Sequence, residues 1–126
     1  MAARELMDVR EADLVGSLSW VDETLVVQLK GSADHASLTA LEQLIDRAQS
    51  EARSARPVEA VVDIRELEFM NSSSLKVFVS WIADLHEEVD QTYKLKFLSN
   101  TKYHWQRRSL VSLRTFAVDR VIVEAT

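Results

Sequence analysis

The chain of 126 residues contains no cysteine, one proline and two glycines. The absence of cysteine excludes disulfides, thiolate nucleophiles and cysteine-based metal sites. So few glycine and proline residues leave no room for a long flexible linker or a collagen-like repeat. An excess of positive charge is also lacking, because the formal net charge is −5. This balance argues against a general nucleic-acid-binding protein, which needs a basic face.

Long apolar runs are absent as well. No run approaches the roughly 20 residues that a membrane span needs, and the start, MAARELMDVREADL, lacks the apolar segment of a signal peptide. We therefore expect a cytoplasmic protein. With 47% apolar and 28% charged residues, the chain predicts one domain over residues 1–126 with a substantial core.

Alternating and β-branched patterns predict five strands. Residues 1–12 show no such pattern and are interpreted as an N-terminal lead-in. Residues 14–20 and 24–30 are separated by a short turn, which is typical of an antiparallel hairpin. Further strands are predicted over residues 60–64, 93–98 and 121–123, and residues 65–70 are expected to form a loop.

Apolar residues at helical spacing predict three helices between these strands. The first begins at Ser37 and stops at Pro57, and the third follows capping residues 99–101. The second follows Asn71, and its apolar stripe comprises Leu75, Phe78, Ile82, Leu85 and Val89. In the third helix the apolar contacts are Trp105, Leu110, Leu113 and Phe116. The order ββαβαβαβ predicts an α/β fold with a mixed β-sheet.

The start of the second helix is the most informative place for function. Asn71, Ser72, Ser73 and Ser74 stand where the first N–H groups of a helix lack partners and the helix dipole is positive. Such an end favours an anion, either a bound phosphate or a phosphate carried by one of the serines. Plain helix capping explains one or two of these residues, so the pattern alone leaves both interpretations open.

The surrounding sequence resembles a known family. Residues 61–75, VVDIRELEFMNSSSL, resemble the signature of STAS domains, the bacterial anti-sigma-factor antagonists and their relatives. Residues 25–31, with Asp34, resemble the early strand, glycine and aspartate of that family. The resemblance extends over about residues 14–123 and implies a single STAS-like domain.

In that family, the first serine after an acidic residue is phosphorylated by a partner that is both a serine kinase and an anti-sigma factor. A phosphatase reverses the modification, and the unphosphorylated form binds the kinase. The resemblance thus implies a non-enzymatic regulator without a cofactor, phosphorylated at Ser72, with Ser73 and Ser74 as alternates. Asn71 stands where the family has an aspartate, and Ser74 stands where it has a glycine.

These two departures keep a second interpretation open. Some STAS-like proteins are constitutive adaptor subunits of a transporter ATPase or of a stress-signalling assembly. Under either interpretation, we expect a partner to contact Ser72, Ser73 and Ser74. Val77, Val79 and Trp81 lie off the main apolar stripe, so Val77 and Trp81 are predicted to extend this surface, with Trp81 as its exposed anchor. Whether the domain also forms a homodimer is left open.

Other constellations are weaker. Asp34 and His35 with a serine would form a hydrolase triad, but no nucleophile-elbow motif is present. The chain's histidines, His35, His86 and His104, lack metal-ligand spacing. Glu66 and Glu68 are candidates for pairing with basic residues of a kinase. Arg107, Arg108 and Arg114 form a basic patch that is explained best as a solvated helical face and second as an anion or partner contact.

Overall fold

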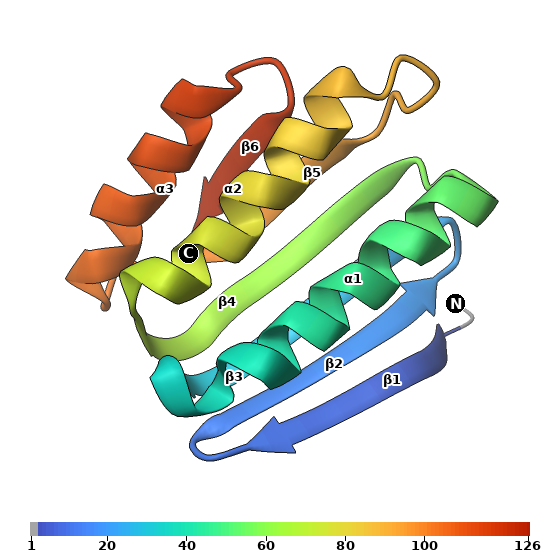
Figure 1. The fold of residues 1–126 in the computed structure, drawn as a ribbon. Coiled ribbons are helices and arrows are strands. Elements are labelled where there is room, and N and C mark those ends of the chain that lie inside the picture. The colour runs from blue at the N-terminus through green and yellow to red at the C-terminus, as the bar shows by residue number, and fades with distance from the viewer. Residues whose placement is uncertain (1–2) are drawn as a thin grey trace.

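A computed structural model of the chain describes residues 3–126. Six strands form one sheet in the order in which they occur in the chain (Figure 1). They are β1 (Ala3–Glu11), β2 (Leu14–Val21), β3 (Thr24–Ala33), β4 (Glu59–Met70), β5 (Lys94–Ser99) and β6 (Val121–Ala125). The pairs β1–β2 and β2–β3 are antiparallel, and the pairs from β3 to β6 are parallel. The predicted α/β fold with a mixed sheet is confirmed.

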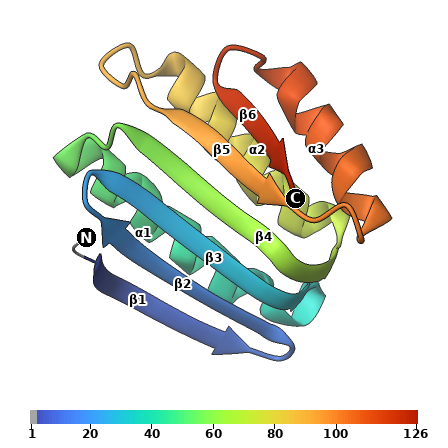
Figure 2. The same cartoon turned by 180° about the vertical axis from the view of Figure 1, so that it is seen from behind.

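The helices connect the parallel strands and cover one face of the sheet. They are α1 (Leu38–Ala55), preceded by the 3-10 turn η1 (His35–Ser37), α2 (Ser72–Glu87) and α3 (His104–Phe116). Right-handed crossovers that advance in one direction across a sheet leave their helices on one side. Seen from behind, the opposite face of the sheet carries no helix (Figure 2).

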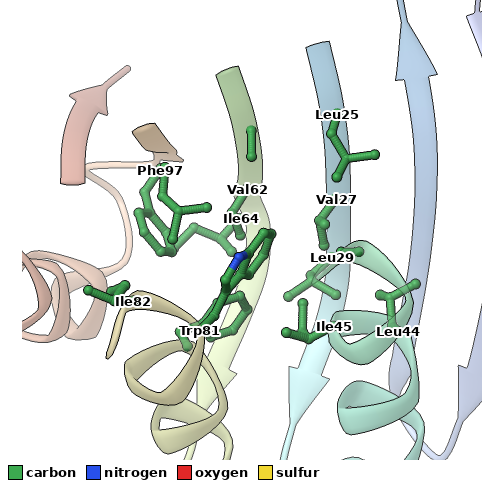
Figure 3. Close-up of a cluster of buried hydrophobic side chains, with 14 of the residues drawn as sticks. Leu25, Val27, Leu29, Leu44, Ile45, Val62, Ile64, Trp81, Ile82 and Phe97 are labelled. Carbon is green, nitrogen blue, oxygen red and sulfur yellow. The ribbon is translucent and has the colours of Figure 1, made fainter. Parts of the chain in front are cut away.

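The core lies between the helices and the sheet. Alternate residues of β2, β3 and β5 are buried, as expected of strands with one covered face. In β4, the three consecutive residues Val62, Asp63 and Ile64 are all buried. The middle of the core, shown in Figure 3, includes Leu25, Val27, Leu29, Leu44, Ile45, Val62, Ile64, Trp81, Ile82 and Phe97. Phe78 and Phe97 meet edge to face, with ring centroids 5.8 Å apart, and this contact ties α2 to β5.

The interpretation of residues 1–12 as a lead-in is wrong, because Ala3–Glu11 forms β1. Its pairing with β2 shifts between Glu5 and Met7, which interrupts the alternation of apolar side chains along the strand. Most β1 side chains are exposed, so the strand carries a weak apolar pattern. The observed order therefore has one strand before the predicted ββαβαβαβ series.

The expected loop over residues 65–70 is also a strand. β4 continues to Met70, but it pairs with β5 only from Glu59 to Asp63, whereas its pairing with β3 extends through Met70. The second half of β4 is thus covered less and buries only Leu67. A polar, sparsely buried extension of this kind resembles a loop in the sequence.

Two helix boundaries differ from the prediction. The stripe of α2 stops at Leu85, because the helix ends at Glu87 and Val89 is 90% exposed beyond it. The third helix is preceded by Tyr103, since Ser99 still belongs to β5. Phe116, the last residue of α3, is 55% exposed and contributes little to the core.

Candidate functional site

The predicted site lies where the parallel strands β3 and β4 end side by side. Asp34 follows β3, and Asn71 follows β4. The Asn71 N–H donates to the carbonyl of Ala33 at 3.0 Å, so the two chain segments stay in register until β4 passes into α2. In open α/β sheets, this carboxyl edge is where loops and helix starts gather to form binding sites.

Asn71 is the N-cap of α2. Its side-chain oxygen accepts the Ser74 N–H at 2.9 Å, and its carbonyl accepts the Leu75 N–H at 3.0 Å. In the part of the chain that the structure describes, the N–H groups of Ser72 and Ser73 have no partner. The first turn of α2 therefore offers two free donors at the positive end of the helix dipole.

The three serines of this turn differ sharply in exposure. Ser72 and Ser73 are exposed, whereas Ser74 is completely buried and its hydroxyl has no partner. The expectation that Ser74 contacts a partner is wrong, because the side chain at this position points into the protein. The Ser74 hydroxyl is thus accommodated in the protein interior.

A groove runs between α1 and α2 beside Ser73. It has a volume of about 280 Å³, and its α2 wall contains Ser73, Lys76 and Val77. The α1 wall contributes two carboxylates, Glu42 and Asp46. Ser73 therefore shares an acidic groove, whereas Ser72 does not line it.

Trp81 is not the exposed anchor that the sequence predicts. It is 1% exposed, and its indole N–H donates to the Tyr93 hydroxyl at 3.0 Å. The reason is the place of α2, which lies between α1 and α3 and is covered on both flanks (Figure 1). Such a helix buries more than one stripe, and Val77 and Val79 are also partly buried against the core. Of the two predicted extensions of the partner surface, Val77 alone reaches a groove.

Phe69 is a surface residue that the sequence pattern does not reveal. It lies near the end of β4, two residues before Asn71, and is 48% exposed. An exposed aromatic ring beside the serines is a candidate partner contact. The sequence shows the apolar pair Phe69–Met70, but it does not show that Phe69 is exposed. That exposure arises because little covers the second half of β4.

Charged residues of β4 lie just before the site in the chain. Glu66 pairs with Lys30 of β3 at 3.4 Å, so one of the two glutamates proposed to meet a kinase already has a partner within the chain. Asp63 accepts two side-chain hydrogen bonds from Arg65, at 2.9 and 2.8 Å. Burial alone would raise the pKa of Asp63, but the hydrogen bonds and charge of Arg65 outweigh burial and hold this pKa below its usual value.

The remaining candidates are not assembled into a site. Asp34 caps η1 by accepting the Ala36 N–H at 3.0 Å, while His35, His86 and His104 lie on three separate helical elements. Among residues 3–126, no group of three metal-binding side chains comes together. None of the described helices combines the length and apolar character of a membrane span.

Comparison with known proteins agrees with this architecture. A family model described as "Mlab, STAS domain" matches residues 17–91, which is more than half of the chain. An anti-sigma factor antagonist from Mycobacterium paratuberculosis has a similar structure, with a TM-score of 0.66 and 20% sequence identity over 86% of this chain and 85% of that one.

The unphosphorylated anti-sigma factor antagonist SpoIIAA is similar too, with a TM-score of 0.58 and 17% identity over 86% of this chain and 87% of its own. No curated protein sequence matches the chain. At these identities the two structures establish the fold, and the family follows from the extent of the family-model match. The chain, with its helix start after a long parallel strand, belongs to the STAS-domain family.

Proposed function

We propose that this protein is a non-enzymatic regulator that binds a serine kinase with anti-sigma activity, and that phosphorylation of Ser72 switches this binding off. The two similar structures are both described as anti-sigma factor antagonists, which supports this kind of role. The observation that carries the proposal is the exposed Ser72 at the first position of α2, next to free N–H donors. The proposal includes a bacterial cytoplasmic location and a phosphatase that reverses the modification.

Exposure and charge favour Ser72 over its neighbours. Ser74 is buried, and a phosphate there would have to bring an uncompensated dianion into the core, at prohibitive cost. Ser73 shares its groove with Glu42 and Asp46, so a phosphate at that position meets like charges. Ser72 does not line that groove, so a phosphate there avoids the two carboxylates. Lys76 stands at i+4 from Ser72 and at i+3 from Ser73, so it is within helical reach of both serines and does not separate them.

A phosphate on Ser72 is compatible with the fold. It adds about −1.5 to −2 charges at neutral pH. At the start of a helix, negative charge is favourable by roughly 0.3–1 kcal/mol, and the free N–H groups of Ser72 and Ser73 are donors for it. The modification therefore acts on association rather than on folding.

The partner surface that we propose surrounds this residue. Phe69 supplies an exposed aromatic contact, and the groove beside Ser73 supplies Val77 and the carboxylates of Glu42 and Asp46. A kinase docked over these residues covers the Ser72 hydroxyl closely. A phosphate at that hydroxyl would lose its water beneath the kinase, and the single charge of Lys76 would not balance the dianion, so the complex would dissociate.

The direct test is incubation with the anti-sigma kinase of the same organism and ATP, followed by mass spectrometry of the peptide that contains residues 69–76. We expect one phosphate on wild-type protein and none on the Ser72→Ala variant. Ser73→Ala is the matched control, since it removes a neighbouring exposed hydroxyl, and it should be phosphorylated like wild type. Phosphate on Ser73 or Ser74 in the Ser72→Ala variant, or no phosphate with the cognate kinase, contradicts the assignment.

A constitutive adaptor is the second candidate, and Asn71 favours it because the family's acidic residue is missing beside the serine. In addition, the description of the matching family model, "Mlab, STAS domain", does not mention anti-sigma antagonists. Binding of the partner by Ser72→Ala and Ser72→Asp variants separates the two functions. The switch predicts that Ser72→Asp alone loses binding, whereas the adaptor predicts equal binding by both variants.

A further inference from the structure

The basic patch on α3 is not used by the proposed switch. α3 carries Arg107, Arg108 and Arg114 and no acidic residue, in a chain whose net charge is −5. Within residues 3–126, none of these three arginines makes an ion pair, whereas Arg47, Arg53 and Arg65 each pair with a carboxylate. Three arginines without a carboxylate partner therefore lie on this one helix.

Two of the arginines border a groove between α3 and β6. The groove has a volume of about 440 Å³, with Arg107, Val111 and Arg114 on its helix wall and Val123 and Ala125 on its strand side. Val111 is 59% exposed although it is apolar. No aspartate or glutamate is among the described residues that line the groove. An apolar floor under a cationic rim suits a ligand that combines apolar and acidic groups.

The groove opens beside a free edge of the sheet. β6 is the last strand, and along one edge it pairs with β5 from Val121 to Ala125. In the described chain, no strand pairs with its other edge. Both views show α3 lying beyond β6, so the flank of the helix overhangs this edge (Figures 1 and 2). A segment that paired with β6 would lie beneath Arg107 and Arg114.

We propose that this groove binds an extended acidic segment of a partner protein, which adds to the sheet as a strand next to β6. Backbone hydrogen bonds to a free strand edge give such a complex its register. Its carboxylates, on the side that faces α3, meet Arg107 and Arg114, whose guanidinium groups bind carboxylates through paired hydrogen bonds. The methylene groups that carry these carboxylates pack on Val111 and Val123. The apolar side chains of the segment point to the opposite face of the sheet, where Ile122 of β6 is 37% exposed. This surface shares no lining residue with the groove beside Ser73.

The probe for this site is a fluorescein-labelled peptide of alternating glutamate and valine, about eight residues long to span one strand. Fluorescence anisotropy at low ionic strength should show binding to wild-type protein. The Arg107→Glu and Arg114→Glu variants should each bind about tenfold more weakly. Arg108→Glu is the matched control, because Arg108 lies on the same helix but does not line the groove, and it should change affinity by less than about twofold.

Further measurements make the proposal falsifiable. The same peptide with N-methyl groups on all of its amides should not bind, since neither of its edges can donate to the free edge of β6. For the unmodified peptide, amide NMR shifts should be confined to α3 and β6. The proposal would be overturned if a lysine–valine peptide bound as tightly as the glutamate–valine peptide. It would also be overturned if Arg107→Glu weakened the binding of a short oligonucleotide equally, or if this chain formed a dimer that buries the free edge of β6. The Ser72→Asp variant should bind the peptide like wild type, so failure of the switch and failure of this site are distinguishable.

Discussion

At the residue scale, Asp63 makes stability depend on pH. Its folded-state pKa lies below the unfolded value because hydrogen bonds from Arg65 outweigh the effect of burial. A carboxyl group with a depressed folded pKa stabilises the protein above its unfolded pKa, near 4, and this contribution is lost as the pH falls through the folded pKa. Asp63→Asn should therefore lower the free energy of unfolding by about 1–3 kcal/mol at pH 7.

Urea denaturation between pH 7 and pH 3 checks this prediction. The difference between wild type and Asp63→Asn should be constant down to about pH 4 and shrink below it. Asp46→Asn is a suitable control, since Asp46 is exposed and makes no described ion pair, and it should change stability little. A difference for Asp63→Asn that stays the same at all pH values would show that charge is not the cause.

The Trp81–Tyr93 pair is the second residue-scale prediction. Tyr93→Phe removes the acceptor of the Trp81 indole N–H, which is buried, so the free energy of unfolding should fall by about 1–3 kcal/mol. Tyr103→Phe removes a hydroxyl that makes no described hydrogen bond and should cost less than about 0.5 kcal/mol. Thermal unfolding measures both, and equal melting temperatures for the two variants would contradict the role of the bond.

At the element scale, α3 is joined to β4 by one side chain. Beyond Asp63, β4 no longer pairs with β5, which leaves its carbonyls without strand partners on that side. The amide of Gln106 donates to the carbonyls of Ile64 and Leu67, at 2.6 and 2.9 Å, and accepts the Asn100 N–H at 2.8 Å. The side chain of Asn100 donates to the carbonyl of Arg65. α3 thus replaces the missing strand along the part of β4 that leads to the serines.

Gln106→Met preserves the length of the side chain but removes these bonds, and we expect it to lower the free energy of unfolding by about 2–4 kcal/mol. Hydrogen exchange at Leu67 and its neighbours on β4 should accelerate more than exchange on β2. Gln43→Met on the exposed face of α1 is the matched control and should leave both measurements nearly unchanged. Equal losses of stability in the two variants would contradict the anchoring role.

At the scale of the whole molecule, one continuous core links all three helices to the sheet, and it predicts a single cooperative unfolding transition. Trp20 lies on β2, Trp81 on α2 and Trp105 on α3, so the three indoles report on different parts of this core. Fluorescence of variants that keep one tryptophan each should give the same urea midpoint as far-UV circular dichroism. Separate midpoints would show that α3 unfolds independently of β1–β3.

How much of the molecule can be predicted from sequence depends on how much of each element is buried. Alternation in β2 and β3 reflects one buried face, and the main apolar stripe of α2 is buried too, so the fold class and most elements were predictable. β1 and the second half of β4 are mostly exposed and carry register shifts, so local patterns were insufficient there. The helix start at Asn71 was predictable from capping chemistry. The burial of Ser74 and Trp81 was not, since it depends on the neighbours of α2 on both flanks.

The order of the strands has a consequence for how the chain acquires this structure. Each strand pairs only with the strands next to it in the sequence, and no later strand inserts between two earlier ones. During synthesis, the sheet can thus grow outward from the first hairpin as the polypeptide leaves the ribosome, with each new crossover docking on a surface that already exists. The edge that is completed last is β6, so a nascent chain needs no rearrangement of earlier pairings to finish the domain.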